Sequence, residues 1–414
     1  MTNRLICLII SIMLLSGCTF VNQLRLRNAN DHLEPVWQKD KTESFLETNY
    51  DGEKPYVYAT INGVEGFKFL VDTGASITIL QDTEKVKTLN LERGYDLAIA
   101  GWGDEQDSPA FQSELVSLEL DNAKFEKVNV AFMPVTKTKY YLRPDEAVFD
   151  GVLGHDVIKH FNWTFDKKNN QIIINSASLP VPESAFTLPI DIFFSKLYID
   201  STIDLGKQQQ LEHELIIDTG SRHYLKINSL YLKKNQYQLP EPSITAADFG
   251  VSGRALHQRI TVPKLNLGGL TMNNVKTNII KSDEDDDFWI VGSALLNQYI
   301  SIIDYQTNQL HLIEYPDSEY RTRYNLLGLE LRKIISGEFV VRFVFPDIVS
   351  DSIDIKEGDL ITSIDGIPSK EISLEKWLTI TGSGGEHHIC RKRIEIVCSN
   401  LTAKQIDGYS RVSK

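Results

Sequence analysis

The hexapeptide Phe69-Leu70-Val71-Asp72-Thr73-Gly74 recurs in the second half of the chain as Leu215-Ile216-Ile217-Asp218-Thr219-Gly220. A short apolar element ending in Gly follows each copy, first Gly151-Val152-Leu153-Gly154 and then Trp289-Ile290-Val291-Gly292. Matching segments in a fixed order indicate an internal repeat. The chain therefore holds two copies of one structural unit.

The two units, at about residues 50–180 and 190–316, are rich in short β-forming runs. Residues 56–61 and 67–71 are β-branched or aromatic, which predicts strands. Asn62-Gly63 between them is a strong hairpin signal. The repeated unit is therefore mainly β.

The repeated aspartates, Asp72 and Asp218, each follow an apolar triplet and precede Thr-Gly. Two carboxylates at close range do not both ionise readily, so one pKa rises and the pair shares a proton. The ionised group can take a proton from water while the protonated group polarises a carbonyl, and peptide hydrolysis requires both. Gly lets the backbone turn tightly, and the Thr hydroxyl can bond the opposite loop.

These segments resemble the aspartic proteases of the pepsin and retroviral type, most of all bacterial retropepsin-like domains, over roughly residues 50–316. The resemblance implies that Asp72 and Asp218 are catalytic and that no metal or organic cofactor is required. It also implies a group of residues that support the two aspartates, namely Thr73, Gly74, Ala75, Thr219, Gly220 and Ser221. The alternative is two structural turns without catalysis.

The residue after each Asp-Thr-Gly distinguishes the two copies. Ser221 can donate a hydrogen bond to Asp218 and favour its ionised form, whereas Ala75 offers Asp72 no such donor. We therefore expect Asp218 to begin as the base and Asp72 as the acid, with the proton belonging to the coupled pair.

The second copy departs from the first at two further places. Arg222 stands where the first copy has Ser76, and Ser293-Ala294 stands where it has His155-Asp156. The Gly-His-Asp segment of the first copy resembles the charged support found in retroviral enzymes. The second copy lacks it, so the sequence does not show which residues support its Asp-Thr-Gly loop. We expect His155 itself to be structural.

Glycine-rich stretches between each Asp-Thr-Gly and its apolar element predict a flap over the substrate. The candidate residues are Gly101, Trp102 and Gly103 in the first copy, and Gly250 and Gly253 in the second. Glycines at a hairpin tip suit a mobile lid, and Trp102 could pack on bound peptide. The alternative is a pair of ordinary hairpin turns with a surface Trp.

The N-terminus has the form of a secretory signal, with Arg4 before an apolar run at residues 5–15. That run is too short for a comfortable membrane span, which takes about 20 residues. Leu15-Ser16-Gly17-Cys18 resembles the lipobox of bacterial lipoproteins, which implies lipid on Cys18 and a periplasm-facing envelope protein. By resemblance to the sorting rule of Gram-negative lipoproteins, Thr19 after the Cys, in place of Asp, favours the outer membrane. A plain signal peptide or an uncleaved anchor is the alternative.

The C-terminal part resembles a PDZ domain, chiefly in Gly358-Asp359-Leu360-Ile361-Thr362-Ser363-Ile364-Asp365-Gly366. Gly328-Leu329-Glu330-Leu331 could receive a peptide carboxylate, and such domains add an extended peptide to a sheet edge. Ser373 is the expected N-cap of a helix that follows. The alternative is a β-rich module that merely packs on the protease.

The composition, with 42% hydrophobic and 24% charged residues, is that of a soluble globular protein. A net charge of −13 without a basic stripe argues against nucleic-acid binding. The acidic run at residues 283–287 is either a solvated loop, which we favour, or a cation site. We do not expect a Cys390–Cys398 disulfide, because a turn at Arg391-Lys392-Arg393 would hold the two residues too far apart.

The predicted fold is mainly β, with two pseudo-symmetric retropepsin-like β-barrel lobes forming one pepsin-like unit and a small C-terminal PDZ-like α+β domain. The predicted function is an aspartic endopeptidase that acts as a monomer on protein or peptide substrates. The alternative is a catalytically inactive, peptide-binding lipoprotein. The expected segments are a signal peptide at 1–17, a tether at 18–50, lobes at 51–182 and 183–318, the PDZ-like domain at 319–400 and a tail at 401–414.

Overall fold

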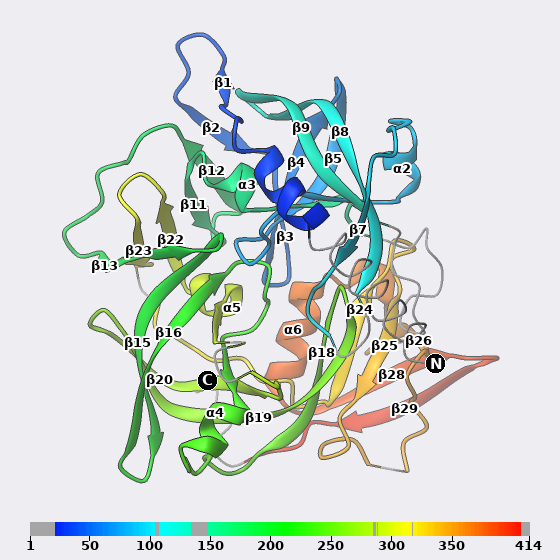
Figure 1. Cartoon of the computed structure of the whole chain (residues 1–414). Coiled ribbons are helices and arrows are strands. Elements are labelled where there is room, and N and C mark those ends of the chain that lie inside the picture. The colour runs from blue at the N-terminus through cyan, green and yellow to red at the C-terminus, as the bar shows by residue number, and fades with distance from the viewer. Residues whose placement is uncertain are drawn as a thin grey trace, which may run out of the picture.

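The computed structural model describes residues 21–103, 107–133, 148–284, 287, 289–316, 318–350 and 352–406. Strands dominate it and form two barrels, a sheet that joins them, and a further sheet at the C-terminal end (Figure 1). The prediction of a mainly β fold with two barrel lobes is confirmed. No helix in the described part of the chain is long and apolar enough to cross a bilayer.

The first barrel, lobe one, closes as a ring in which β4, β5, β10, β6, β9 and β8 each bond to the next and β8 returns to β4. The ring strands are β4 (Lys54–Ile61), β5 (Val64–Val71), β6 (Ile79–Gln81), β8 (Ser108–Leu120), β9 (Ala123–Met133) and β10 (Gly151–Leu153). Outside the ring lie β1 (Val36–Trp37), β3 (Thr48–Asp51), β7 (Asp96–Ile99) and α2 (Glu84–Lys87). Asn62 and Gly63 turn β4 into β5 with φ of 52° and 80°, the left-handed geometry of the predicted hairpin.

The second barrel, lobe two, closes in the same way through β15, β16, β21, β17, β20 and β19. These strands are β15 (Lys196–Gly206), β16 (Gln209–Asp218), β17 (Leu225–Asn228), β19 (Gly253–Leu267), β20 (Leu270–Ile280) and β21 (Ile290–Gly292). Outside the ring lie β14 (Asp191–Phe193), β18 (Ile244–Gly250) and α4 (Ser229–Lys234). Each ring strand matches one of lobe one in order, so the repeat extends through the whole barrel.

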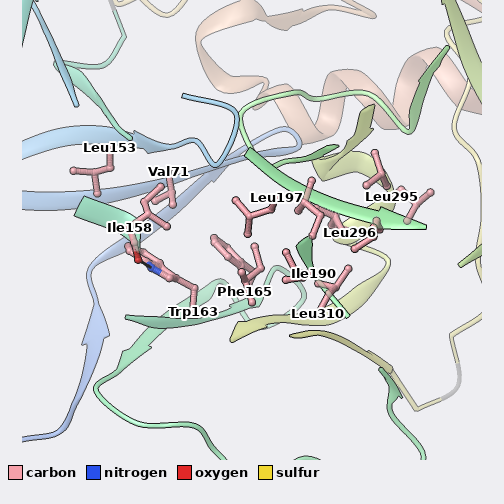
Figure 2. Packing of buried hydrophobic residues seen from close by; sticks show 14 of the residues in the cluster. Val71, Leu153, Ile158, Trp163, Phe165, Ile190, Leu197, Leu295, Leu296 and Leu310 are labelled. Carbon is pink, nitrogen blue, oxygen red and sulfur yellow. Dashed lines mark hydrogen bonds between the residues drawn. The ribbon is translucent and has the colours of Figure 1, made fainter. Parts of the chain in front are cut away.

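A sheet in the order β13-β23-β22-β11-β12-β2 joins the two lobes. Its strands are β2 (Glu43–Leu46), β11 (Asn162–Asp166), β12 (Gln171–Asn175), β13 (Phe186–Pro189), β22 (Tyr299–Asp304) and β23 (Gln309–Glu314), with α3 (His155–Ile158) and α5 (Ser293–Leu296) preceding β11 and β22. Val71 and Trp163 of lobe one share a core with Leu197 and Leu310 of lobe two (Figure 2). A buried side chain of this size stabilises by about 1.5–3 kcal/mol, so this common core fixes one lobe against the other.

The C-terminal unit is a sheet in the order β24-β25-β26-β28-β29 with one longer helix, α6. Its elements are β24 (Leu329–Lys333), β25 (Phe339–Val344), β26 (Leu360–Ile364), β27 (Ile367–Pro368), η2 (Ser369–Glu371), α6 (Leu374–Ser383), β28 (Glu386–Lys392) and β29 (Ile396–Thr402). Ser373 caps α6 as predicted, because its hydroxyl accepts the Lys376 N–H at 3.1 Å. Trp377 and Phe339 are fully buried at the centre of this unit.

The structure corrects the expectation for the two C-terminal cysteines. Cys390 and Cys398 are joined in a disulfide with a Cα–Cα distance of 4.0 Å. They lie directly opposite each other because β28 and β29 pair as far as Lys392 with Ile396, which puts the turn at residues 393–395. The sequence placed this turn two residues too early, and with that register the two cysteines would not have faced each other.

The chain before lobe one is not the irregular tether that the sequence suggested. Residues 21–29 form a helix, and Leu26 is buried against lobe one. Asn30 donates to the Asn129 carbonyl at 2.8 Å. β1, β2 and β3 then join the lobe-one and joining sheets, so most of this segment is structural. Cys18 lies outside the described residues.

Candidate active site

Each repeated Asp lies at the end of a strand that is held inside its barrel. β5 runs parallel to β10, and the Asp72 N–H donates to the Leu153 carbonyl at 3.2 Å. In lobe two, β16 runs parallel to β21, and Asp218 lies opposite Gly292. Val71 and Ile217, the residues immediately before each Asp, are fully buried, which fixes both strand ends at the interface between the lobes.

Thr73 and Thr219 lock the two Asp-Thr-Gly loops together. The Thr73 hydroxyl donates to the Ile217 carbonyl at 2.7 Å and accepts the Thr219 N–H at 3.1 Å. The Thr219 hydroxyl makes the reciprocal pair, donating to the Val71 carbonyl at 2.7 Å and accepting the Thr73 N–H at 3.1 Å. Both threonines are buried. Removing either hydroxyl would leave buried polar groups unpaired, and each unpaired group would lower the unfolding free energy by about 1–3 kcal/mol.

Asp72 and Asp218, referred to below as the dyad, each lie against the loop of the other. The Gly74 N–H donates to Asp72 Oδ1 at 2.8 Å, and the Ser221 N–H donates to Asp218 Oδ1 at 2.9 Å. A Cβ atom on Gly74 would stand 2.7 Å from the carboxylate carbon of Asp218, and one on Gly220 would come closer still to that of Asp72. Only glycine permits this approach.

Burial, and after it the charge of Asp218, raises the pKa of Asp72 from 3.8 to about 7. Lys54, Lys196 and the N–H of Gly74 act in the opposite direction. A carboxyl group with a pKa near 7 keeps its proton in mild acid. Asp72 can therefore act as an acid in that pH range, as one member of a carboxyl pair that shares a proton must.

The predicted hydrogen bond from the Ser221 hydroxyl to Asp218 is wrong. Within the described part of the chain, Ser221 Oγ is buried without a hydrogen-bond partner. The backbone of Ser221 makes the contacts instead, because its N–H bonds Asp218 and its carbonyl accepts the N–H and hydroxyl of Ser293 at 2.7 and 2.8 Å. The side chain therefore gives no basis for choosing Asp218 as the base.

Two lysines that the sequence did not predict as site residues flank the dyad. Lys54 begins β4, and Lys196 begins β15, the equivalent strand of lobe two. The Lys196 ammonium donates to the Gly74 carbonyl, and both lysines lower the pKa of Asp72. Each is followed two residues later by Tyr. This Lys-x-Tyr pattern is the signal that would have identified them, had the repeat been extended upstream.

The two lobes support their dyad loops with different chemistry. In lobe one the buried Asp156 carboxylate accepts the Thr78 hydroxyl at 2.8 Å. In lobe two the uncharged Ser293 holds the Ser221 carbonyl with two hydrogen bonds, which answers the question left open by the missing His-Asp pair. Burial lowers the pKa of His155 to about 4, so its ring is neutral above that pH and it packs on Tyr305.

The glycine-rich stretches lie at the tips of two hairpins, β7–β8 and β18–β19, and these tips touch. The Trp102 carbonyl accepts the Ser252 N–H at 2.9 Å. The Trp102 ring lies 3.8 Å from the Lys226 ammonium, measured to the ring centroid. Lys226 in turn pairs with Asp248 at 2.9 Å. Trp102 therefore contacts the opposite lobe in this conformation.

The C-terminal unit packs on the second hairpin and on the chain beside the dyad. Ile244 and Ala247 of β18 share a core with Phe343 of β25. Arg222, which follows the second Asp-Thr-Gly-Ser segment, forms an ion pair with Glu330 of β24. Arg222 is one of the residues by which lobe two departs from lobe one, and this ion pair gives that departure a structural reason.

Comparison with known proteins finds similarity in sequence for lobe one and a weaker similarity in structure. The sequence profile of a family described as "Aspartyl protease" matches residues 57–157, from β4 through α3 and including Asp72. No curated protein matches the chain. Among solved structures, the chain is similar to the aspartic proteinase of Irpex lacteus, with 16% identity, a TM-score of 0.42, and coverage of 66% of this chain and 97% of that one. The first lobe is thus aspartyl-protease-like in sequence.

Proposed function

We propose that the protein is an aspartic endopeptidase that hydrolyses peptide bonds with water activated between Asp72 and Asp218. The observation that carries the proposal is the reciprocal bonding of Thr73 and Thr219, which brings one Asp-Thr-Gly loop from each lobe into a single site. Two unrelated structural turns would not require this shared lock.

The raised pKa of Asp72 supports its role as the starting acid and leaves Asp218 as the starting base. Asp218 would take a proton from the water as it attacks, and Asp72 would protonate the carbonyl oxygen of the substrate. The proton gained by the base then passes to the leaving amine. The single proton belongs to the pair, so these roles describe one of two coupled states.

Digestion of a peptide library between pH 3 and 8, read by mass spectrometry, tests the proposal. The wild type should cleave, while Asp72→Asn and Asp218→Asn should each abolish cleavage without unfolding the protein. Cleavage that survives in both variants would overturn the proposed chemistry.

The contact between the hairpin tips favours a second candidate, an inactive protease fold that only binds peptides. Ser252 bonds the Trp102 carbonyl, and the C-terminal unit holds β18, so both hairpins are engaged already. In this proposal the PDZ-like C-terminal unit would receive a peptide on a sheet edge. Peptide binding by the wild type without cleavage at any pH in that range would favour this candidate.

We also propose that the protein is anchored by lipid on Cys18 and faces the periplasm, most simply from the outer membrane. The support is the sequence Leu15-Ser16-Gly17-Cys18, which lies shortly before the helix at residues 21–29. Cys18→Ala should abolish lipid labelling and either release the protein from membranes or leave it uncleaved. Wild-type protein that takes up no lipid label, together with a variant that fractionates and is processed normally, would refute the anchor.

A further inference from the structure

A cavity of about 150 Å³ lies where the two lobes meet the C-terminal unit. Its walls come from the turn between β3 and β4, from the chain after the second Asp-Thr-Gly, and from β24 and α6. A cavity of this volume holds several water molecules. It therefore has room for a carboxylate-bearing side chain or a chain terminus.

The cavity walls are strongly cationic in an acidic protein. Among the described residues that line it, eight are Lys or Arg and three are Asp or Glu, although the chain carries a net charge of −13. Burial lowers the pKa of Lys276 well below its ordinary value, yet an excess of positive charge remains if Lys276 is counted as neutral. A low-dielectric recess of one sign concentrates ligands of the opposite sign.

Three of these cations line the same cavity and come from three different parts of the chain, and two of them act on the charge of the third. They are Lys54 of lobe one, Arg222 of lobe two and Arg332 of the C-terminal unit. Burial and then the charge of Arg222 lower the pKa of Lys54 to about 8, with a smaller effect from Arg332, while the charges of Asp72 and Asp248 act in the opposite direction. In the described part of the chain, no carboxylate lies within ion-pair distance of the Lys54 ammonium. A bound anion would relieve this repulsion.

Glu330 shows that the recess accepts a carboxylate. Its Oε1 atom pairs with Arg222 and lies 3.4 Å from Arg342. Its side chain is only 10% exposed, so the pair is largely removed from water. Guanidinium groups bind carboxylates through directed, charge-assisted hydrogen bonds, and a second carboxylate beside Glu330 would meet Lys54 and Arg332.

The recess is electrostatically joined to the dyad. The charge of Lys54 acts on Asp72. Arg222 is next in the chain to Ser221, whose N–H holds Asp218. A carboxylate bound in the recess would therefore lie near the dyad, where the proposed cleavage takes place.

We propose that this cavity binds a carboxylate of the peptide substrate through Lys54, Arg222 and Arg332, so that the protein selects acidic peptides. The inference rests on the proposed endopeptidase function, and it names the substrate class. The carboxylate comes either from a Glu or Asp side chain or from the C-terminus of the peptide.

The test compares matched peptides on the full-length protein. One series moves a single Glu through an otherwise neutral peptide, with Gln at the same position as the reference. A second series compares a free C-terminal acid with its amide. We expect kcat/KM to favour one acidic position, or the free acid, by roughly tenfold or more, the range of a charged hydrogen bond. The series that responds identifies the source of the carboxylate.

Two variants shift the preference in opposite directions. Arg332→Gln should reduce the ratio of acidic to neutral kcat/KM several-fold. Glu330→Gln should increase it, because Arg222 and Arg342 lose their internal carboxylate. A purely structural role for Glu330 would not increase the preference. Lys376→Gln removes one charge from the exposed face of α6 and should leave the ratio unchanged.

Binding to the Asp72→Asn protein, followed by fluorescence anisotropy, separates this inference from the proposed function. If the acidic peptide binds better and Arg332→Gln removes the difference, the site stands even when the wild type cleaves nothing. If the wild type cleaves but both peptide series give ratios near one, the site is refuted and the endopeptidase stands. An unchanged ratio in Arg332→Gln also refutes the site.

Discussion

Asp72→Asn should stabilise the protein at alkaline pH while abolishing the proposed activity. Asp72 has a pKa of about 7 in the folded protein against 3.8 ordinarily. A carboxyl group with a raised pKa favours the folded state fully below pH 3.8. That contribution is lost as the pH rises through about 7, since the charged form is disfavoured in the folded site. Asn stays neutral throughout and escapes this penalty.

The size of the effect follows from the two pKa values. They differ by about three units, and each unit corresponds to about 1.4 kcal/mol. The variant should therefore exceed the wild type by about 4 kcal/mol in unfolding free energy at pH 8, and by less than about 1 kcal/mol at pH 4. Folded domains are typically stable by about 5–15 kcal/mol, so the difference is readily measured.

Urea unfolding followed by tryptophan fluorescence at pH 4, 5, 6, 7 and 8 measures this difference. Trp163 and Trp289, buried in the common core, report on both lobes. Asp40→Asn is the matched control because it makes the same chemical change at an exposed position, on the turn after β1. A flat difference for Asp72→Asn, or one that shrinks as the pH rises, would refute the raised pKa and the dyad built on it.

Further predictions concern the groups around the dyad and the C-terminal hairpin. The alkaline limb of kcat/KM should lie near pH 7, and Lys54→Met, which removes a charge that lowers the pKa of Asp72, should move this limb up by about one pH unit. Ser221→Ala should leave the acid limb of the kcat/KM profile unchanged, because the Ser221 hydroxyl bonds no described residue. A shift of that limb would show that the hydroxyl does donate to Asp218. Thr219→Val should lower the unfolding free energy by about 1–3 kcal/mol in urea and reduce kcat with it. Replacing Cys390 and Cys398 together by Ser should destabilise the C-terminal unit by about 2–4 kcal/mol in calorimetry and leave kcat unchanged.

The barrel architecture was predictable because local sequence and long-range pairing agree in it. Each Asp-Thr-Gly needs a buried strand before it and a glycine at the point of approach, and both requirements are visible in Val71, Gly74, Ile217 and Gly220. The order of apolar elements then specifies which strand runs beside the other. For this reason the repeat predicted the correct fold class, although its matching segments lie far apart in the chain.

What the sequence did not show are contacts set by distances across the fold. Lys54 and Lys196 share a Lys-x-Tyr pattern that marks them as equivalent, but only the barrel geometry shows that both act on the dyad. The carbonyl of Ser221 accepts the N–H and the hydroxyl of Ser293, a contact across the fold that no local pattern encodes. A two-residue error in one turn was enough to miss the Cys390–Cys398 bond, since side-chain pairing in a hairpin follows the register.

The places where the two lobes differ are also the places where other parts of the chain attach. The β7 hairpin of lobe one is held from outside by the helix at residues 21–29, where the Asn22 amide donates to the Asp96 carbonyl at 2.9 Å. The β18 hairpin of lobe two is held instead by the C-terminal unit, where the Thr245 N–H donates to Asp347 at 2.6 Å. Both outer contacts lie at the start of the first strand of their hairpin, away from the tips that touch. Since the two outer contacts use different partners, the asymmetry of the repeat extends to the way in which its two hairpins are held.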